Sequence, residues 1–168
     1  MIQKRSLLLQ PKKLNKLYNK ALLGSDVDLP KYYSRLAVLE LGSWVEECMK
    51  DIVQCYPRRK RLRDRPNVDY MNTILNENYG FDYNRNFRKM LKRISGIVVL
   101  ERVERKMNPV LKQGLESALT IVYPERNDHA HKPIRSAPNF TSPSVCVSLF
   151  NDIYKGLEEY EKQFKKLQ

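Results

Sequence analysis

Apolar residues recur at three- and four-residue steps along most of the chain, the spacing of one face of an α-helix. The longest such pattern covers residues 30–56, with Pro30 expected to begin the helix and Pro57 to end it. Its apolar positions are Leu36, Leu39, Trp44, Val45, Cys48, Met49, Ile52 and Val53. A stripe of this width is typical of a central helix. Gly42 lies within the pattern and is expected to permit a close helix crossing.

The same spacing predicts further helices elsewhere in the chain. They cover residues 11–23, 67–78, 84–106, 108–123 and 142 to the C-terminus. Pro11 is expected to begin the first, and Gly96 to divide the third. Ser142 is expected to be the N-cap of the last, with Pro143 as its first helical residue.

No segment alternates as a strand would, apart from weak valine-rich stretches, so the predicted fold class is all-α. We expect an up-and-down bundle of four to five main helices. A chain of 168 residues is about one domain in length. The prediction is therefore a single helical domain over residues 1–168, with residues 1–29 as an N-terminal helical extension and 30–165 as its core.

The charge of the chain indicates a polyanionic partner. Lysine and arginine number 31 against 19 acidic residues, a net charge of +12, which favours nucleic acid, most simply RNA. Residues 58–65 form a strongly basic run, and residues 85–92 add basic positions at helical spacing. The candidate RNA-binding residues are Arg58, Arg59, Lys60, Arg61, Arg63, Arg88 and Lys92. The alternative is that the run is a solvated linker and the second group a solvated helix face.

Other patterns exclude several classes. The longest aliphatic run, Ile97–Leu100, is far too short for a transmembrane helix, so no membrane association is expected. Three cysteines, an odd number, argue against a disulfide framework and favour a reducing, cytoplasmic location. No glycine-rich phosphate loop is present, which excludes P-loop and dinucleotide-binding enzymes, and no cofactor is expected.

The only two histidines, His129 and His131, lie in one short segment together with Arg126 and Asn127. Histidine moves protons near neutral pH, and arginine binds a phosphate through paired hydrogen bonds. We therefore take Arg126, Asn127 and His131 as candidate catalytic residues for phosphodiester chemistry. Supporting candidates are His129 and Asp128, although His129 could equally be a solvated or hydrogen-bonded structural histidine. The two histidines lack a clear third ligand, so no metal site is predicted.

The pattern Arg126-Asn127-x-x-Ala130-His131 resembles the Arg-x4–6-His motif of the HEPN superfamily, including the polar residue after the arginine. The wider chain resembles the RiboL-PSP type of HEPN domain over roughly residues 30–165. Residues 33–50 look like its long first helix, residues 114–119 like the helix leading into the motif, and residues 142–164 like its closing helix.

The resemblance implies a homodimeric endoribonuclease that needs no metal. The ribose 2′-OH would attack the adjacent phosphorus and leave a 2′,3′-cyclic phosphate. His131 would act as general acid or base, Arg126 would stabilise the phosphorane, and Asn127 would hold His131 or a phosphate oxygen. The family setting is that of a toxin or phage-defence effector with a cognate antitoxin or defence partner. The alternative, which Pro124 favours, is a non-catalytic HEPN module that binds RNA, a nucleotide or a partner protein.

Helical geometry adds an expectation about the oligomer. Pro124 suits a helix start, and Lys132 is biased away from helix because Pro133 follows it, so residues 124–132 are predicted to form a short helix. Residues five apart on a helix differ by about 140° around its axis, so Arg126 and His131 would not share a face. Two copies related by a two-fold axis could supply both groups to one phosphate.

Overall fold

The computed structural model describes residues 5–134 and 140–167, without the side chains of residues 5–9 and Arg59. The regular secondary structure in the described ranges is helical and includes no strand, which confirms the all-α class and the helical bundle. The elements are α1 (Arg5–Ala21), α2 (Leu29–Arg59), α3 (Arg65–Asn76), the π-helix η1 (Tyr83–Phe87), α4 (Arg88–Ser95), α5 (Ile97–Lys106), α6 (Pro109–His131) and α7 (Pro143–Lys166). No helix among these is long and apolar enough to cross a membrane.

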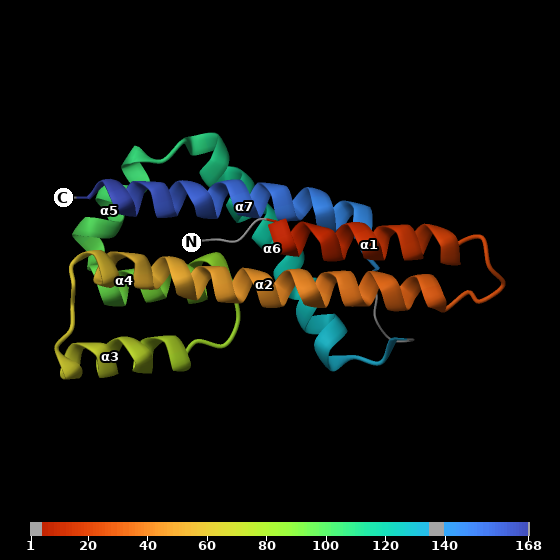
Figure 1. The fold of residues 1–168 in the computed structure, drawn as a ribbon, viewed down its shortest axis with the longest axis horizontal. Helices are drawn as coiled ribbons and strands as arrows, with labels where there is room; N and C mark the ends of the chain where they lie inside the picture. Colours follow the sequence, from red (N-terminus) through yellow and green to blue (C-terminus); the bar gives the residue numbers. More distant parts are fainter. Residues whose placement is uncertain (1–4, 135–139, 168) are drawn as a thin grey trace.

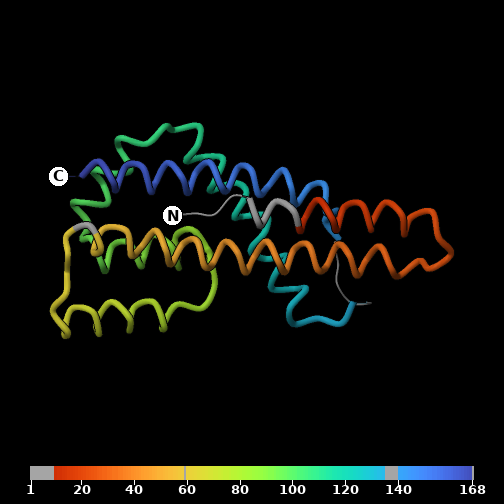
Figure 2. Tube along the Cα trace, viewed as in Figure 1, coloured from red at the N-terminus to blue at the C-terminus, as the bar shows by residue number. Residues whose placement is uncertain are grey.

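Helix α2 is the centre of the bundle. It packs against α1, α6 and α7, and α6 also packs on α7 (Figure 1). Trp44, Val45 and Met49 of α2 are buried, as are Ile52 and the other positions of the C-terminal part of its stripe. Leu36, at the start of the stripe, is 44% exposed. Figure 2 shows α3 at the end of the bundle away from α1, where it packs on α4.

Three prolines at which the sequence predicted a helix to start or end lie inside helices in the structure. Helix α1 begins before Pro11, α2 continues past Pro57, and α6 runs through Pro124. A proline removes one backbone hydrogen bond and crowds the preceding turn, which costs about 3 kcal/mol in a helix interior. In α6 this cost is offset because the helix is buried on both sides of Pro124, at Val122 before it and at His129 after it. The prediction of a separate helix over 124–132 was therefore wrong.

Glycine and serine signals predicted two other boundaries correctly. Gly96 adopts φ +82°, ends α4 and begins α5, as expected from its position. Ser142 precedes α7 with Pro143 as the first helical residue, as predicted. Its hydroxyl pairs with Ser144 at 2.8 Å rather than with the backbone of the first turn.

Helices α6 and α7 cross closely at Gly156. A Cβ at this position would lie 2.5 Å from the Cβ of Leu115 and 3.0 Å from the carbonyl oxygen of Leu111. We expect Gly156→Ala to lower the free energy of unfolding by about 1–3 kcal/mol, because the helices must move apart. Urea denaturation measures this. Gly114→Ala is the matched control, because nothing lies within 4 Å of its added Cβ. That control is expected to raise stability by about 0.5–1 kcal/mol; equal losses for the two variants would contradict the close crossing.

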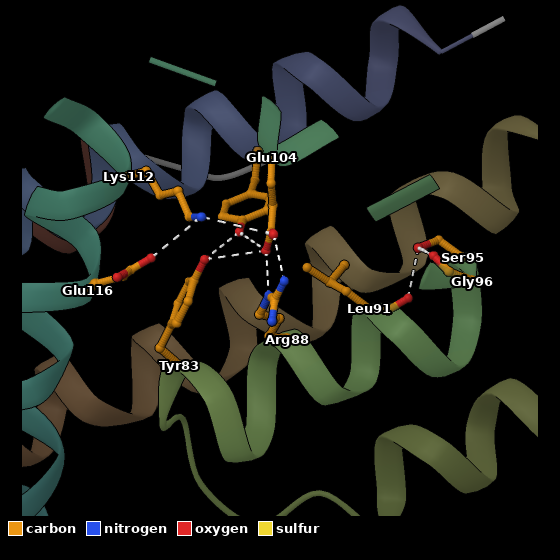
Figure 3. Close-up of polar contacts among 9 residues, drawn as sticks. Tyr83, Arg88, Leu91, Ser95, Gly96, Glu104, Lys112 and Glu116 are labelled. Carbon is orange, nitrogen blue, oxygen red and sulfur yellow. Dashed lines mark hydrogen bonds and ion pairs between the residues drawn. The ribbon is translucent and has the colours of Figure 1, made fainter. Parts of the chain in front are cut away.

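A buried polar cluster joins five elements, η1, α4, α5, α6 and α7, at the end of the bundle near α5 (Figure 3). The guanidinium of Arg88 donates two hydrogen bonds to the carboxylate of Glu104, of 2.7 and 2.8 Å. The Tyr160 hydroxyl donates to the same carboxylate at 3.1 Å and lies 2.7 Å from the Tyr83 hydroxyl. The ammonium of Lys112 in α6 lies 3.9 Å from the Glu104 carboxylate. The Glu104 side chain is only 8% exposed, so its partners replace the water that it loses.

Candidate active site

The segment Arg126–His131 forms the last turn and a half of α6. The helix ends at Lys132, which has extended backbone angles of φ −104° and ψ 144°, as the following proline predicted. Its amide still donates to the carbonyl of Asp128 at 2.8 Å, and its ammonium lies 2.7 Å from the carboxylate of the same residue. The end of the motif is thereby fixed as helix.

Arg126 lies against α2 at Gly42. A Cβ added to Gly42 would come within 2.6 Å of the Cγ of Arg126, so only glycine leaves room for this side chain. This confirms the close crossing expected at Gly42. The aromatic ring of Phe81 bounds the same space, 3.1 Å from the built Cβ. The stem of Arg126 is therefore enclosed between α2 and the segment that precedes η1.

The guanidinium of Arg126 is beside a carboxylate of α2. One of its nitrogens lies 3.8 Å from a carboxylate oxygen of Glu46, one helical turn after Gly42. Another donates to the side-chain oxygen of Asn127 at 3.2 Å. Lys50 donates to the second oxygen of Glu46 at 3.1 Å. The Arg126 side chain remains 26% exposed, so solvent and a ligand can reach it.

The two histidines lie in opposite environments. His129 is fully buried, its ring centre lies 5.2 Å from that of Phe140, and its Nε2 is 3.5 Å from a carboxylate oxygen of Glu125. Neither ring nitrogen has a hydrogen-bond partner among the described residues. His131 is exposed at the end of α6. Only His131 is accessible to a large substrate such as RNA, and His129 packs in the core.

A contact that sequence reasoning missed holds the start of α7 against the motif. The carboxylate of Glu125 accepts hydrogen bonds from the backbone amide and the hydroxyl of Thr141, of 2.6 and 2.5 Å. Phe140, next to Thr141, covers His129. Glu125 and Thr141 are sixteen positions apart in the sequence, and no local pattern links them. Glu125 therefore fixes Thr141, the residue next to the Phe140 ring that covers the buried histidine.

The helix separates the predicted catalytic residues as its geometry requires. Arg126 faces α2, whereas His131 faces solvent, and Asn127 and Asp128 are partly exposed between them. Within the described residues, no group of three or more histidine, cysteine or acidic side chains is placed to hold a metal ion. The arrangement provides one partly exposed guanidinium and one exposed imidazole on different faces of one helix.

The predicted RNA-binding residues fall into separate places. The run 58–65 is not one linker, because α2 includes Arg58 and Arg59, and α3 begins at Arg65. Lys60, Arg61 and Arg63 are exposed between the two helices, and the side chain of Arg59 lies outside the described residues. Arg58 lies 3.8 Å from Asp51.

The second group does not form one continuous basic stripe. Lys92 is exposed, but Arg88 turns inward to Glu104 and is 29% exposed. The hydrogen bonds that Arg88 donates to the Glu104 carboxylate raise the pKa of Arg88, so this charge is already balanced.

No family model matches the chain, and neither a curated protein nor a solved structure was found to match it.

Proposed function

We propose that the chain is a metal-independent endoribonuclease of the HEPN type that acts as a homodimer. The observation that supports it best is the placement of the motif. Arg126 is enclosed over Gly42 with its guanidinium beside Glu46, and His131 is exposed at the end of the same helix. Binding of a phosphate needs a positioned cation, and proton transfer needs an accessible imidazole.

In the proposed reaction, the ribose 2′-oxygen forms a bond to phosphorus and the bond to the 5′-oxygen breaks. The products are a 2′,3′-cyclic phosphate and a 5′-hydroxyl. His131 removes the proton from the 2′-hydroxyl or protonates the leaving 5′-oxygen. Arg126 stabilises the extra negative charge on the phosphorane. An entering phosphate competes with Glu46, whose 3.8 Å separation from Arg126 is longer than a direct hydrogen bond.

The exposed face of α6 supports the proposed symmetric dimer. Ile121, Pro124 and His131 are all exposed at helical spacing on this face, and Ile121 is 51% exposed. A two-fold pairing of these faces would cover Ile121 and Pro124. Because Arg126 lies on a different side of the helix, the composite site further requires that His131 of one protomer extend past this contact to the exposed part of the other protomer's Arg126. Each composite site would then hold one cation and one imidazole.

Cleavage of a labelled single-stranded RNA in EDTA tests the proposal. We expect the wild type to cut the RNA and leave a 2′,3′-cyclic phosphate end. His131→Ala should lower the rate by about 10²–10⁴-fold, the usual contribution of one general acid or base. His129→Phe is the matched control, because His129 is buried and its ring nitrogens have no hydrogen-bond partner among the described residues. This variant should cleave at close to the wild-type rate.

A different outcome would favour the second candidate function, a non-catalytic module that binds RNA, a nucleotide or a partner protein. The contacts of Arg126 with Glu46 and Asn127 favour this candidate, since they already occupy the guanidinium. RNA that shifts in a gel but stays intact with every variant would replace the nuclease by the binding module. Unchanged cleavage by His131→Ala would refute the assigned mechanism. The proposed cellular setting, a toxin or phage-defence effector, requires in addition that expression arrest growth and that His131→Ala relieve it.

A further inference from the structure

Two adjoining hollows follow the seam between α3 and α4. The first has a volume of about 230 Å³, and its lining includes Arg85, Lys89 and Arg93. The second has a volume of about 130 Å³, and its lining includes Tyr70, Met71 and Ile94. Arg93 lines both, so the two hollows are neighbours along one groove. We call this feature the α3–α4 groove.

The first hollow carries excess positive charge. Its three cations are four residues apart along η1 and α4, which places successive ones about 6 Å apart along the helix axis. The single acidic residue in its lining, Glu77, pairs with Arg93 at 2.8 Å. Arg85 and Lys89 are exposed, and neither side chain has an acidic partner among the described residues. Two cations thus remain available for an anion.

The two asparagines that line this hollow, Asn78 and Asn86, form hydrogen bonds within the protein. Asn86 donates to Asn78 at 2.9 Å and accepts from the backbone amide of Asp82 at 2.9 Å. Asn78 in turn donates to the carbonyl of Gly80 at 2.9 Å. These bonds hold the loop between α3 and η1. The floor of the hollow is therefore fixed, and the anion would be bound by Arg85 and Lys89.

The second hollow is apolar and has an aromatic residue at its edge. Leu62, Val68 and Ile94 contribute to its lining beside Tyr70, which is 55% exposed. The guanidinium of Arg93 lies 5.9 Å from the centre of the Tyr70 ring. Arg61 and Arg63, the neighbours of Leu62, are exposed and add positive charge at this end.

We infer that the α3–α4 groove binds single-stranded RNA, with backbone phosphates at Arg85 and Lys89 and a base against Tyr70. Cationic grooves with aromatic residues along them are the usual surfaces for single-stranded nucleic acid. The choice of RNA among single-stranded polyanions rests on the proposed ribonuclease function. The groove lies on elements other than α6, so it would bind a part of the RNA that is distant from the cleaved bond.

A binding experiment can test the groove independently of catalysis. The probe is a labelled 2′-O-methyl oligonucleotide, which lacks the attacking hydroxyl and stays intact. We expect Arg85→Gln, Lys89→Gln to weaken binding by about 10-fold. The negative slope of log K against log salt should become shallower by about 1.4, from two lost phosphate contacts. The matched control is Lys12→Gln, Lys16→Gln, which removes two exposed lysines four residues apart on α1. This control should bind within about two-fold of the wild type, with an unchanged slope.

Substitution of Tyr70 tests the base contact. Tyr70→Ala is expected to weaken binding by about 5- to 150-fold, whereas Tyr70→Phe keeps the ring and should bind as the wild type does. Equal losses in the two double-charge variants, no binding by the wild type, or equal affinity for poly-glutamate would each overturn the inference. If the wild type does not cleave RNA in the EDTA assay but binds the oligonucleotide in the groove, only the proposed nuclease function would be refuted.

Discussion

Replacing Glu104 by alanine is expected to lower the free energy of unfolding by about 3–5 kcal/mol, since it removes a buried carboxylate that accepts hydrogen bonds from Tyr160 and from the partly buried cation of Arg88. Arg88 would lose both of its hydrogen bonds, of 2.7 and 2.8 Å, and Tyr160 would lose its acceptor. Urea denaturation of the two proteins measures the difference. The expected loss is a large part of the 5–15 kcal/mol that stabilises a typical domain.

Glu101→Ala is the control for this prediction. Glu101 lies three residues earlier on α5 and is exposed, and it pairs with exposed Arg105 at 3.4 Å. Such surface pairs contribute about 0–1 kcal/mol, so this variant should be nearly as stable as the wild type. A loss of less than about 1 kcal/mol for Glu104→Ala would show that the cluster stabilises little beyond its apolar surroundings.

The same cluster gives the protein a pH dependence. Burial of the Glu104 carboxyl acts to raise its pKa, but the hydrogen bonds from Arg88 and the charge of Lys112 outweigh it, and the pKa is lowered below the usual 4.5. A folded-state pKa below the unfolded one means that the stabilisation is complete above the unfolded pKa. It is lost as the pH falls through the folded-state pKa. The wild type should thus lose more stability on acidification than Glu104→Ala does.

Local pattern was sufficient for the helices and insufficient for their ends. The faces of α2 and α7 follow from spacing, because burial along one face repeats every three or four residues. The helix boundaries predicted at Pro11, Pro57 and Pro124 were wrong. The prediction considered the local cost of a proline but not the tertiary packing of the residues beyond it. The break at Gly96 was right, because a positive φ is a local property that glycine supplies.

For the candidate site, the sequence supplied the residue types but not their partners. Arg126, His129 and His131 stand out as one segment, yet only the fold shows that one histidine is buried and the other exposed. The space at Gly42 was expected, whereas its occupant, the stem of Arg126, was not. The Glu104 cluster gave no signal, because its members come from five elements brought together only by the tertiary fold.

Mixing Arg126→Ala with His131→Ala protein is expected to restore about a quarter of the wild-type cleavage rate, if each composite site pairs Arg126 of one protomer with His131 of its partner. In an equal mixture about half of the dimers are mixed, and each mixed dimer has one complete site and one site that lacks both groups. The placement of the two residues on different faces of α6 motivates this arrangement. The measurement is RNA cleavage in EDTA after subunit exchange, verified with two differently tagged chains.

The control mixes Arg126→Ala with the double variant Arg126→Ala, His131→Ala, in which no dimer can hold a complete site, so no recovery is expected. The mixture of the two single variants distinguishes a composite site from a site within one protomer, for which no recovery is expected. Each single variant would then be defective in its own site, and exchange would restore nothing. Absence of recovery in verified mixed dimers would place Arg126 and His131 in the same protomer's site. Such a site would require the end of α6 to depart from the helix, so that residues five apart could reach one phosphate.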